Sequence, residues 1–181
     1  MPKKEPSPKP GGPRARPDLA VILFLTLLGS YAYFWQSRDW NSATRLMLTY
    51  ALGDRHQLEI DGLEQQAGQR EYNRFTRRHE MVAGDLAQVG PHYYTDKAPG
   101  QSLLGLPVYA IGQLIGLPEH PLNRPAIAYW PADYFVTLGT SGVATAALAV
   151  IVYAFSLRLG ASHFAGMLLA VAYGLGTPAF L

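Results

Sequence analysis

The sequence contains no cysteine, which excludes disulfide bonds and metal sites built from thiolates. Charged residues make up only 15% of the chain, against about 25% in a typical soluble domain. The formal net charge of +2 is too small to indicate a nucleic-acid-binding surface. His56, His79 and His92 are scattered through a polar region rather than paired on a helix, so no metal site is expected.

Internal repeats are also absent, and the glycine-rich piece "GLGTP" follows no predicted strand, so it does not indicate a phosphate-binding loop. Hydrophobic residues, in contrast, make up 49% of the chain. The few charges concentrate at the N-terminus and in the middle, which leaves long uncharged blocks on either side. This distribution is typical of a membrane protein.

Four apolar blocks are candidates for membrane-spanning helices: residues 19–36, 101–117, 132–157 and 161–181. The second block is short and contains Pro107, which membrane helices tolerate where neighbours satisfy the backbone. The sequence ends inside the fourth block. We therefore expect an all-α integral membrane protein with about four transmembrane helices, as a fragment of a longer helical bundle.

The first 18 residues are rich in proline, glycine, lysine and arginine, so we expect a disordered tail. Its basic residues precede an apolar block, which places the tail in the cytoplasm by the positive-inside rule. Tyr31, Tyr33 and Trp35 gather at the far end of that block, as in an interfacial aromatic belt. A cleavable signal peptide is the alternative, but no small-residue cleavage site follows the apolar core.

Residues 37–100 form a polar region that we expect to be a loop outside the cytoplasm. Within it, "NSATRLMLTYAL" predicts a short helix that begins at Asn41 or Ser42 and ends at Gly53. Its apolar stripe favours a juxtamembrane helix lying along the bilayer surface. We interpret "QLEID" as a brief extended piece and residues 62–81 as loop or weak helix.

The stretch "HYYTDKAPGQSLLGLPVY" resembles a signature of polytopic bacterial glycosyltransferases similar to dolichyl-phosphate-mannose–protein mannosyltransferases, members of the C-type membrane superfamily. "NSATRLMLTYAL" resembles the family's juxtamembrane helix, with Arg45 at the place of its arginine. "GDLAQVGPHYYTDK" places Asp85 on a family acid, and "SLRLGASHFAGMLLAVAYGLGTP" resembles the stretch that leads into the fourth helix. The similarity covers the chain from Arg45 to Pro178.

The resemblance implies transfer of a sugar from a polyprenyl-phosphate donor to an acceptor on the periplasmic side of the bacterial inner membrane. Such transfer needs a carboxylate to activate the acceptor hydroxyl and cations to stabilise the departing phosphate. We expect Asp85 and Asp61 as catalytic acids. We expect Lys97, Tyr94 and Arg45 as substrate-binding residues, with the lipid-linked sugar as substrate and no certain cofactor.

The chain departs from the family in two places. The interval between Asp61 and Asp85 is longer than usual, and the acidic pair that often opens the juxtamembrane helix is replaced by "WNSATR", with Asp39 slightly earlier. Which acid is catalytic therefore stays open at this point.

Each candidate residue also has a simpler interpretation. Lys97 can mark the membrane boundary, Asp85 can be a solvated loop acid, and Asp61 can shape a turn beside Gly62. Tyr93 and Tyr94 can be interfacial aromatics. The basic run after residue 69 can be a solvated face or can meet anionic lipid.

A second function also fits the sequence: a small non-catalytic membrane subunit that packs against other membrane subunits of a larger complex. Continuation of the reading frame past Leu181 into further hydrophobic spans favours the enzyme, and a stop codon there favours the subunit. A transporter is a weaker third, because no predicted span carries a charge at its centre.

Overall fold

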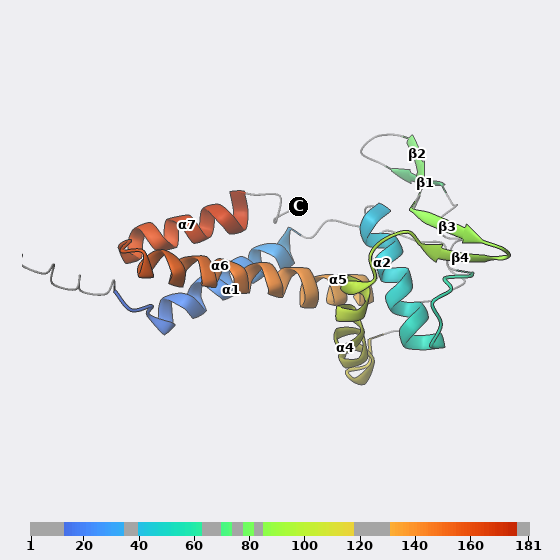
Figure 1. Ribbon diagram of the computed structural model, residues 1–181, viewed down its shortest axis with the longest axis horizontal. Helices are drawn as coiled ribbons and strands as arrows, with labels where there is room; N and C mark the ends of the chain where they lie inside the picture. The colour runs from blue at the N-terminus through green and yellow to red at the C-terminus, as the bar shows by residue number, and fades with distance from the viewer. Residues whose placement is uncertain are drawn as a thin grey trace, which may run out of the picture. The chain divides into compact units, whose positions relative to one another are not determined.

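The computed structural model describes residues 13–34, 40–62, 70–73, 78–81, 85–117 and 131–176 (Figure 1). Three parts of the sequence-based predictions lie outside these residues: the tail up to residue 12, Asp39, and the end of the fourth apolar block from residue 177 onward. The chain divides into two compact units. The first, the helical unit, contains Met1–Tyr33 and Gly142–Leu181, and the second, the mixed unit, contains Phe34–Ser141.

The helical unit is built from α1 (Pro17–Tyr33), α6 (Val143–Arg158) and α7 (His163–Gly176). Leu23 and Leu27 of α1 are buried in its core with residues of α6 and α7: Ala146, Ala149, Tyr153, Leu157 and Ala170. Small residues let these helices approach closely, because a Cβ on Gly174 would lie 2.9 Å from the Leu27 side chain. The Tyr31 hydroxyl donates a hydrogen bond to the Gly174 carbonyl at 2.7 Å, which ties α1 to α7.

The outer faces of these three helices are apolar. Val21, Leu25, Ile151, Phe155 and Leu168 all have more than half of their surface exposed. Among the described residues, one helix is long and apolar enough to cross a membrane. It runs through 28 residues, Pro131–Arg158, and so comprises α5 (Pro131–Thr137), the π-helical turn η2 (Leu138–Gly142) and α6. The helices α1 and α7 are shorter, with 17 and 14 residues.

In the mixed unit, the central helix is α2 (Trp40–Tyr50), which continues into the π-helical turn η1 (Ala51–Arg55). One side of α2 contributes Ala43, Met47 and Leu48 to a core that also contains Ile60 and touches Leu86 and Tyr93. The other side contributes Leu46 and Tyr50 to a core with residues of two later helices: Tyr109, Ala132 and Val136. The helix predicted at "NSATRLMLTYAL" is thus present, but it is buried on two sides rather than carrying a single apolar stripe.

Two antiparallel hairpins accompany α2, so the prediction of an all-α fold is wrong for this part of the chain. In the first, β1 (Arg70–Asn73) pairs with β2 (Arg78–Met81), where we expected loop or weak helix. In the second, β3 (Leu86–Val89) pairs with β4 (His92–Thr95). Gly90, at the turn of the second hairpin, has φ of +62°, which favours glycine. The fold is mostly helical with two small two-stranded sheets.

The helix α4 (Gly100–Leu114) follows β4 and contains Pro107. It occupies most of the block predicted as the second membrane span, but its 15 residues extend only about 22 Å. Its inner face carries Gly105 and Gly112, which bring it close to α2 and α5: a Cβ on Gly105 would lie 3.0 Å from Thr49 Oγ1 and 3.2 Å from Val136 Cγ1. The described residues therefore support one membrane-crossing helix directly, rather than four.

Candidate functional site

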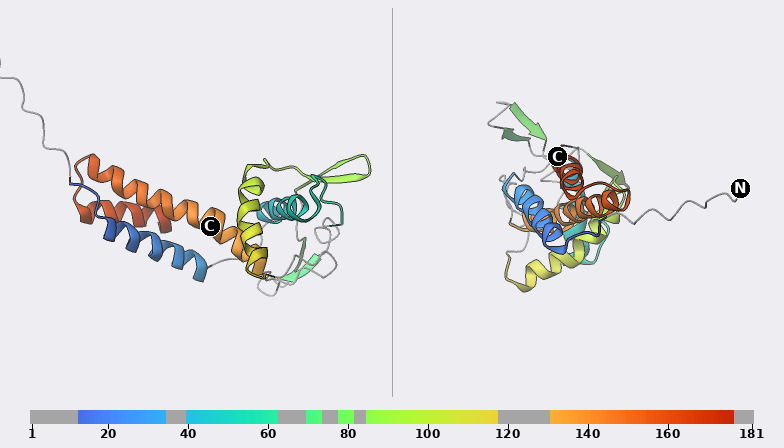
Figure 2. Two further views of the ribbon diagram at one scale, coloured as in Figure 1. Left: turned by 90° about the horizontal axis from the view of Figure 1, so that it is seen from below. Right: turned by 90° about the vertical axis from the view of Figure 1, so that its left-hand side faces the viewer.

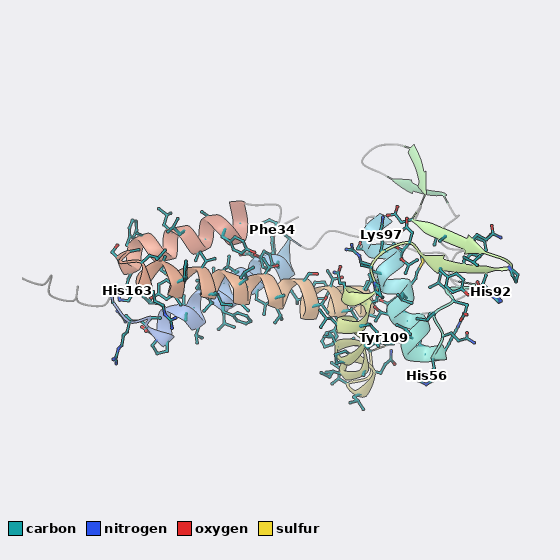
Figure 3. The ribbon with its side chains drawn as sticks, viewed as in Figure 1. Phe34, His56, His92, Lys97, Tyr109 and His163 are labelled. Carbon is teal, nitrogen blue, oxygen red and sulfur yellow. The ribbon has the colours of Figure 1, made fainter. Side chains whose placement is uncertain are left out.

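The register of the second hairpin decides which of the predicted site residues meet. Leu86 pairs with Thr95 at the open end of the hairpin, whereas Val89 pairs with His92 beside the turn. Asp85 comes just before Leu86, and Asp96 and Lys97 come just after Thr95, so all three lie at the open end. Figure 3 shows Lys97 at this end and His92 at the other.

Lys97 forms ion pairs with both acids at the open end. Its Nζ lies 3.3 Å from Asp85 Oδ2 and 3.4 Å from Asp96 Oδ1. Lys97 and Asp85 are about one quarter exposed (25% and 23%), whereas Asp96 is 44% exposed. Burial lowers the pKa of Lys97, but hydrogen bonds and charge from the two acids outweigh it, so the pKa is raised. The lysine therefore stays charged at any physiological pH.

Arg45 lies on α2 beside the first turn of α4. Its Nη1 donates to Gln101 Oε1 at 2.8 Å, and Gln101 Nε2 in turn donates to Ser141 Oγ at 2.9 Å. The Nε of Arg45 is buried and has no hydrogen-bond partner in the part of the chain that the structure describes, nor does any acid there pair with the guanidinium. A buried donor without a partner costs about 1–3 kcal/mol, and more when it is charged. This arginine is therefore a cation with unused hydrogen-bonding capacity.

Two short polar side chains hold α2 and α4 together next to Arg45. Ser102 is buried, and its hydroxyl donates to the Arg45 carbonyl at 2.9 Å. The Thr49 hydroxyl donates to the Arg45 carbonyl at 3.0 Å, and its Oγ1 also lies 3.2 Å from the Ser102 carbonyl. These bonds fix Arg45 relative to the beginning of α4.

The beginning of α4 adds a further source of positive potential. Pro99 stands at the N-cap and no side chain caps the helix; Leu103 N donates to the Pro99 carbonyl at 2.9 Å. The first backbone N–H groups of a helix lack partners within it and carry the positive end of its dipole. We refer to Lys97, Arg45, Asp85 and the first turn of α4 together as the α4-start site.

Asp61 does not join this site. Its Oδ1 accepts a hydrogen bond from Tyr93 N at 2.7 Å, and its Oδ2 lies 2.6 Å from His92 Nδ1. The hydrogen bond from His92, then that from Tyr93, lowers the pKa of Asp61. A carboxylate with a lowered pKa is a weaker base. The geometry gives Asp61 a structural task, because it anchors the turn at residues 61–62 to the hairpin, alongside the bond from Ile60 N to the Tyr93 carbonyl.

The His92–Asp61 pair should make the hairpin sensitive to pH. The hydrogen bond to Asp61 raises the pKa of His92 above 6.5, so its stabilisation is complete below 6.5 and is lost as the pH rises through the raised value. The lowered pKa of Asp61 means that its own contribution is lost only when the pH falls below 3.8. NMR titration of the His92 ring protons should show a raised pKa that Asp61→Asn returns toward 6.5. An unchanged titration in Asp61→Asn would contradict the pairing, because Glu59 contributes less.

Tyr94 is also engaged away from the α4-start site. Its hydroxyl donates to Glu59 Oε1 at 3.2 Å. Burial, followed by this hydrogen bond, raises the pKa of the Tyr94 phenol, so the group remains protonated. The ring of Tyr93 packs against the α2 core. The structure thus gives both tyrosines intramolecular partners.

Two tyrosine–aspartate pairs inside the mixed unit were not expected from the sequence. Tyr50 and Asp133 are both 1% exposed, and the Tyr50 hydroxyl donates to Asp133 Oδ1. The Tyr109 hydroxyl lies 2.9 Å from Asp54 Oδ1, and its ring centroid lies 5.0 Å from that of Tyr50. Asp133 was the available signal in the sequence. It lies at the start of the longest apolar block, and a buried acid needs a hydrogen-bond donor as a partner.

Among the described residues, no group of three or more histidines, aspartates and glutamates is arranged to hold a metal ion. The α4-start site offers two cations and a helix N-terminus, with the carboxylates of Asp85 and Asp96 beside Lys97. No family model, curated protein or solved structure matches this chain.

Proposed function

We propose that this protein is a glycosyltransferase of the bacterial inner membrane that transfers a sugar from a polyprenyl-phosphate donor to an acceptor on the periplasmic side. Lys97, Arg45 and the first turn of α4 bind the donor phosphate, and Asp85 serves as the catalytic acid–base group. The proposal rests on the resemblance of residues 45–178 to that enzyme family and on the α4-start site.

One observation carries the proposal: a guanidinium with a buried, unpartnered Nε lies at the start of an uncapped helix, three residues after Lys97. Cations, fixed N–H donors and a helix N-terminus are the groups that bind phosphate in proteins. Nothing in the described part of the mixed unit uses the spare donor of Arg45.

Asp85 fits the second requirement of the reaction because it lies next to the lysine that would bind the phosphate. In the proposed step, the acceptor oxygen forms a bond to the anomeric carbon of the sugar and loses its proton to Asp85. The bond between that carbon and the phosphate oxygen breaks, and the electron pair leaves with the polyprenyl phosphate. Lys97 and Arg45 stabilise the charge that develops on the phosphate. Asp61 is the weaker candidate because both its oxygens are occupied.

The membrane location is supported by the apolar outer faces of the helical unit and by the 28-residue helix Pro131–Arg158. We propose that α1 and α7 cross the bilayer with it. The two ends of the helical unit differ: Figure 1 shows the start of α1 and the connection from α6 to α7 at one end, which carries Arg14, Arg16 and Arg158. Tyr31, Tyr33 and Tyr173 belong to the other end. Under the positive-inside rule, the basic end is cytoplasmic.

The direct test is a transfer assay with the full chain in lipid nanodiscs, using radiolabelled sugars linked to undecaprenyl phosphate. We expect release of undecaprenyl phosphate that depends on an added acceptor. A titration with undecaprenyl phosphate alone, monitored by tryptophan fluorescence, tests binding of the lipid phosphate independently of which sugar the enzyme uses. Absence of both turnover and binding would contradict the proposal, whereas binding without turnover would support the phosphate site but not sugar transfer.

A further inference from the structure

One face of α4 is apolar and exposed along its whole length. Its members are spaced at three and four residues, as one side of a helix requires: Leu103, Leu104, Pro107, Ile111, Leu114 and Ile115. Leu104 and Leu114 are 68% and 86% exposed. We propose that α4 lies in the plane of the membrane surface with this face in lipid, instead of crossing the bilayer. The inference rests on the membrane location proposed above, but not on sugar transfer.

The opposite face of α4 is fully occupied within the mixed unit. Ser102, Gly105, Tyr109 and Gly112 are buried there. A Cβ on Gly112 would lie 3.3 Å from the Phe135 ring, and one on Gly139 would lie 2.5 Å from Val108. One side of α4 is thus fixed against α2, α5 and η2. The exposed apolar face is thus the side of α4 that is left to meet lipid.

The contacts of α4 with the long apolar helix also indicate that α4 lies near the membrane surface. Pro131–Arg158 is about 42 Å long, so it exceeds a hydrocarbon core of about 30 Å by about eight residues. The contacts of α4 fall on Phe135, Val136 and Gly139, which belong to the first turns of that helix. Figures 1 and 2 show α4 crossing α5 rather than running alongside it. If α5 follows the membrane normal, α4 lies in the membrane plane.

The composition of the exposed face favours lipid over a protein partner. It contains only aliphatic side chains and a proline, whereas protein interfaces are enriched in aromatic residues and arginine. The helix carries no charged residue, and Asp96 and Lys97 stand immediately before it. Such an arrangement places the apolar face in the acyl boundary and the α4-start site at the depth of the lipid phosphates.

The absence of cysteine from the chain permits a direct test by site-directed spin labelling. Single cysteines at Leu104, Ile111 and Ile115 would be labelled in the full chain, reconstituted in vesicles of phosphatidylcholine and phosphatidylglycerol. Depth is measured from relaxation by oxygen and by a nickel chelate. Labels at Ile151, on the exposed face of α6, and at Gln88, on the exposed part of β3, provide the lipid and water references.

We expect the three α4 labels to report shallow depths that agree within about 5 Å. A membrane-crossing α4 would instead spread them over about 16 Å, since Leu104 and Ile115 are eleven residues apart. That spread would overturn the inference while leaving the membrane location intact. Strong nickel access at all three positions, or protection from both reagents as in a protein interface, would also overturn it. A label at Ile151 outside lipid would overturn the membrane location itself.

Discussion

Replacing Lys97 by glutamine is expected to weaken the binding of undecaprenyl phosphate by about 30-fold, which corresponds to about 2 kcal/mol. The substitution removes one charged hydrogen-bond donor from the α4-start site. It also leaves Asp85, whose Oδ2 lies 3.3 Å from the lysine, as an uncompensated negative charge beside the phosphate. Both effects act in the same direction. The measurement is a fluorescence titration of the full chain in nanodiscs with undecaprenyl phosphate.

Two further variants make this result interpretable. Lys97→Arg keeps the charge but changes its shape, so we expect it to retain most of the affinity, within about 5-fold. Arg158→Gln removes a cation from the exposed end of α6 and should leave binding unchanged. If Lys97→Gln and Arg158→Gln bind the lipid phosphate equally well, Lys97 only marks the membrane boundary and the phosphate site lies elsewhere.

The helices were the predictable part of this fold. Long uncharged blocks indicate α1, α6 and α7 because only helices satisfy their backbone in an apolar surrounding. Asn41 or Ser42 as a start and Gly53 as a stop bracket the apolar residues of α2, although the helix begins at Trp40 and continues through Gly53 into η1. The predicted helix ends differ from the observed ones by a few residues, since hydropathy reports composition and not where hydrogen bonding stops.

The hairpins were harder to predict, for a physical reason. Each of the four strands has only four residues, which is too short for an alternating pattern to stand out from loop sequence. The turn at Gly90 and Pro91 was the usable signal, because it separates "LAQV" from "HYYT" by two residues. Without that hairpin, the sequence could not tell which acid of the loop lies beside Lys97.

The sequence therefore predicted the residues of the candidate site, but not which of the two acids lies beside Lys97. The sequence placed Asp85 ahead of Asp61 only through the family resemblance, since both are acids of the same polar loop. The antiparallel register separates them by placing Asp85 at the open end of the hairpin with Lys97. The carboxylate of Asp61 instead bonds to His92 and Tyr93, near the turn of the same hairpin. The register of a hairpin is set by its turn and by the side chains that pair across it, and strands of four residues carry too little pattern to fix it from the sequence.

Replacing Asp85 by asparagine should have opposite effects on the two measurable steps. Loss of a general base lowers the rate of transfer by about 10²- to 10⁴-fold. The same change removes the carboxylate that competes with the donor phosphate for Lys97 Nζ, so binding of undecaprenyl phosphate should become tighter. The transfer assay and the fluorescence titration measure these quantities separately in the same preparation.

Asp96 provides the matched control, because its Oδ1 lies 3.4 Å from the same lysine atom. Asp96 is more exposed than Asp85, so Asp96→Asn should tighten phosphate binding slightly and leave transfer within a few-fold of the wild type. Equal transfer rates in the two variants would show that Asp85 is not the base. Weaker binding together with slower transfer in Asp85→Asn alone would make Asp85 a positioning residue that holds Lys97 in place. Tighter binding with slow transfer, found only for Asp85→Asn, is the result that identifies it as the base.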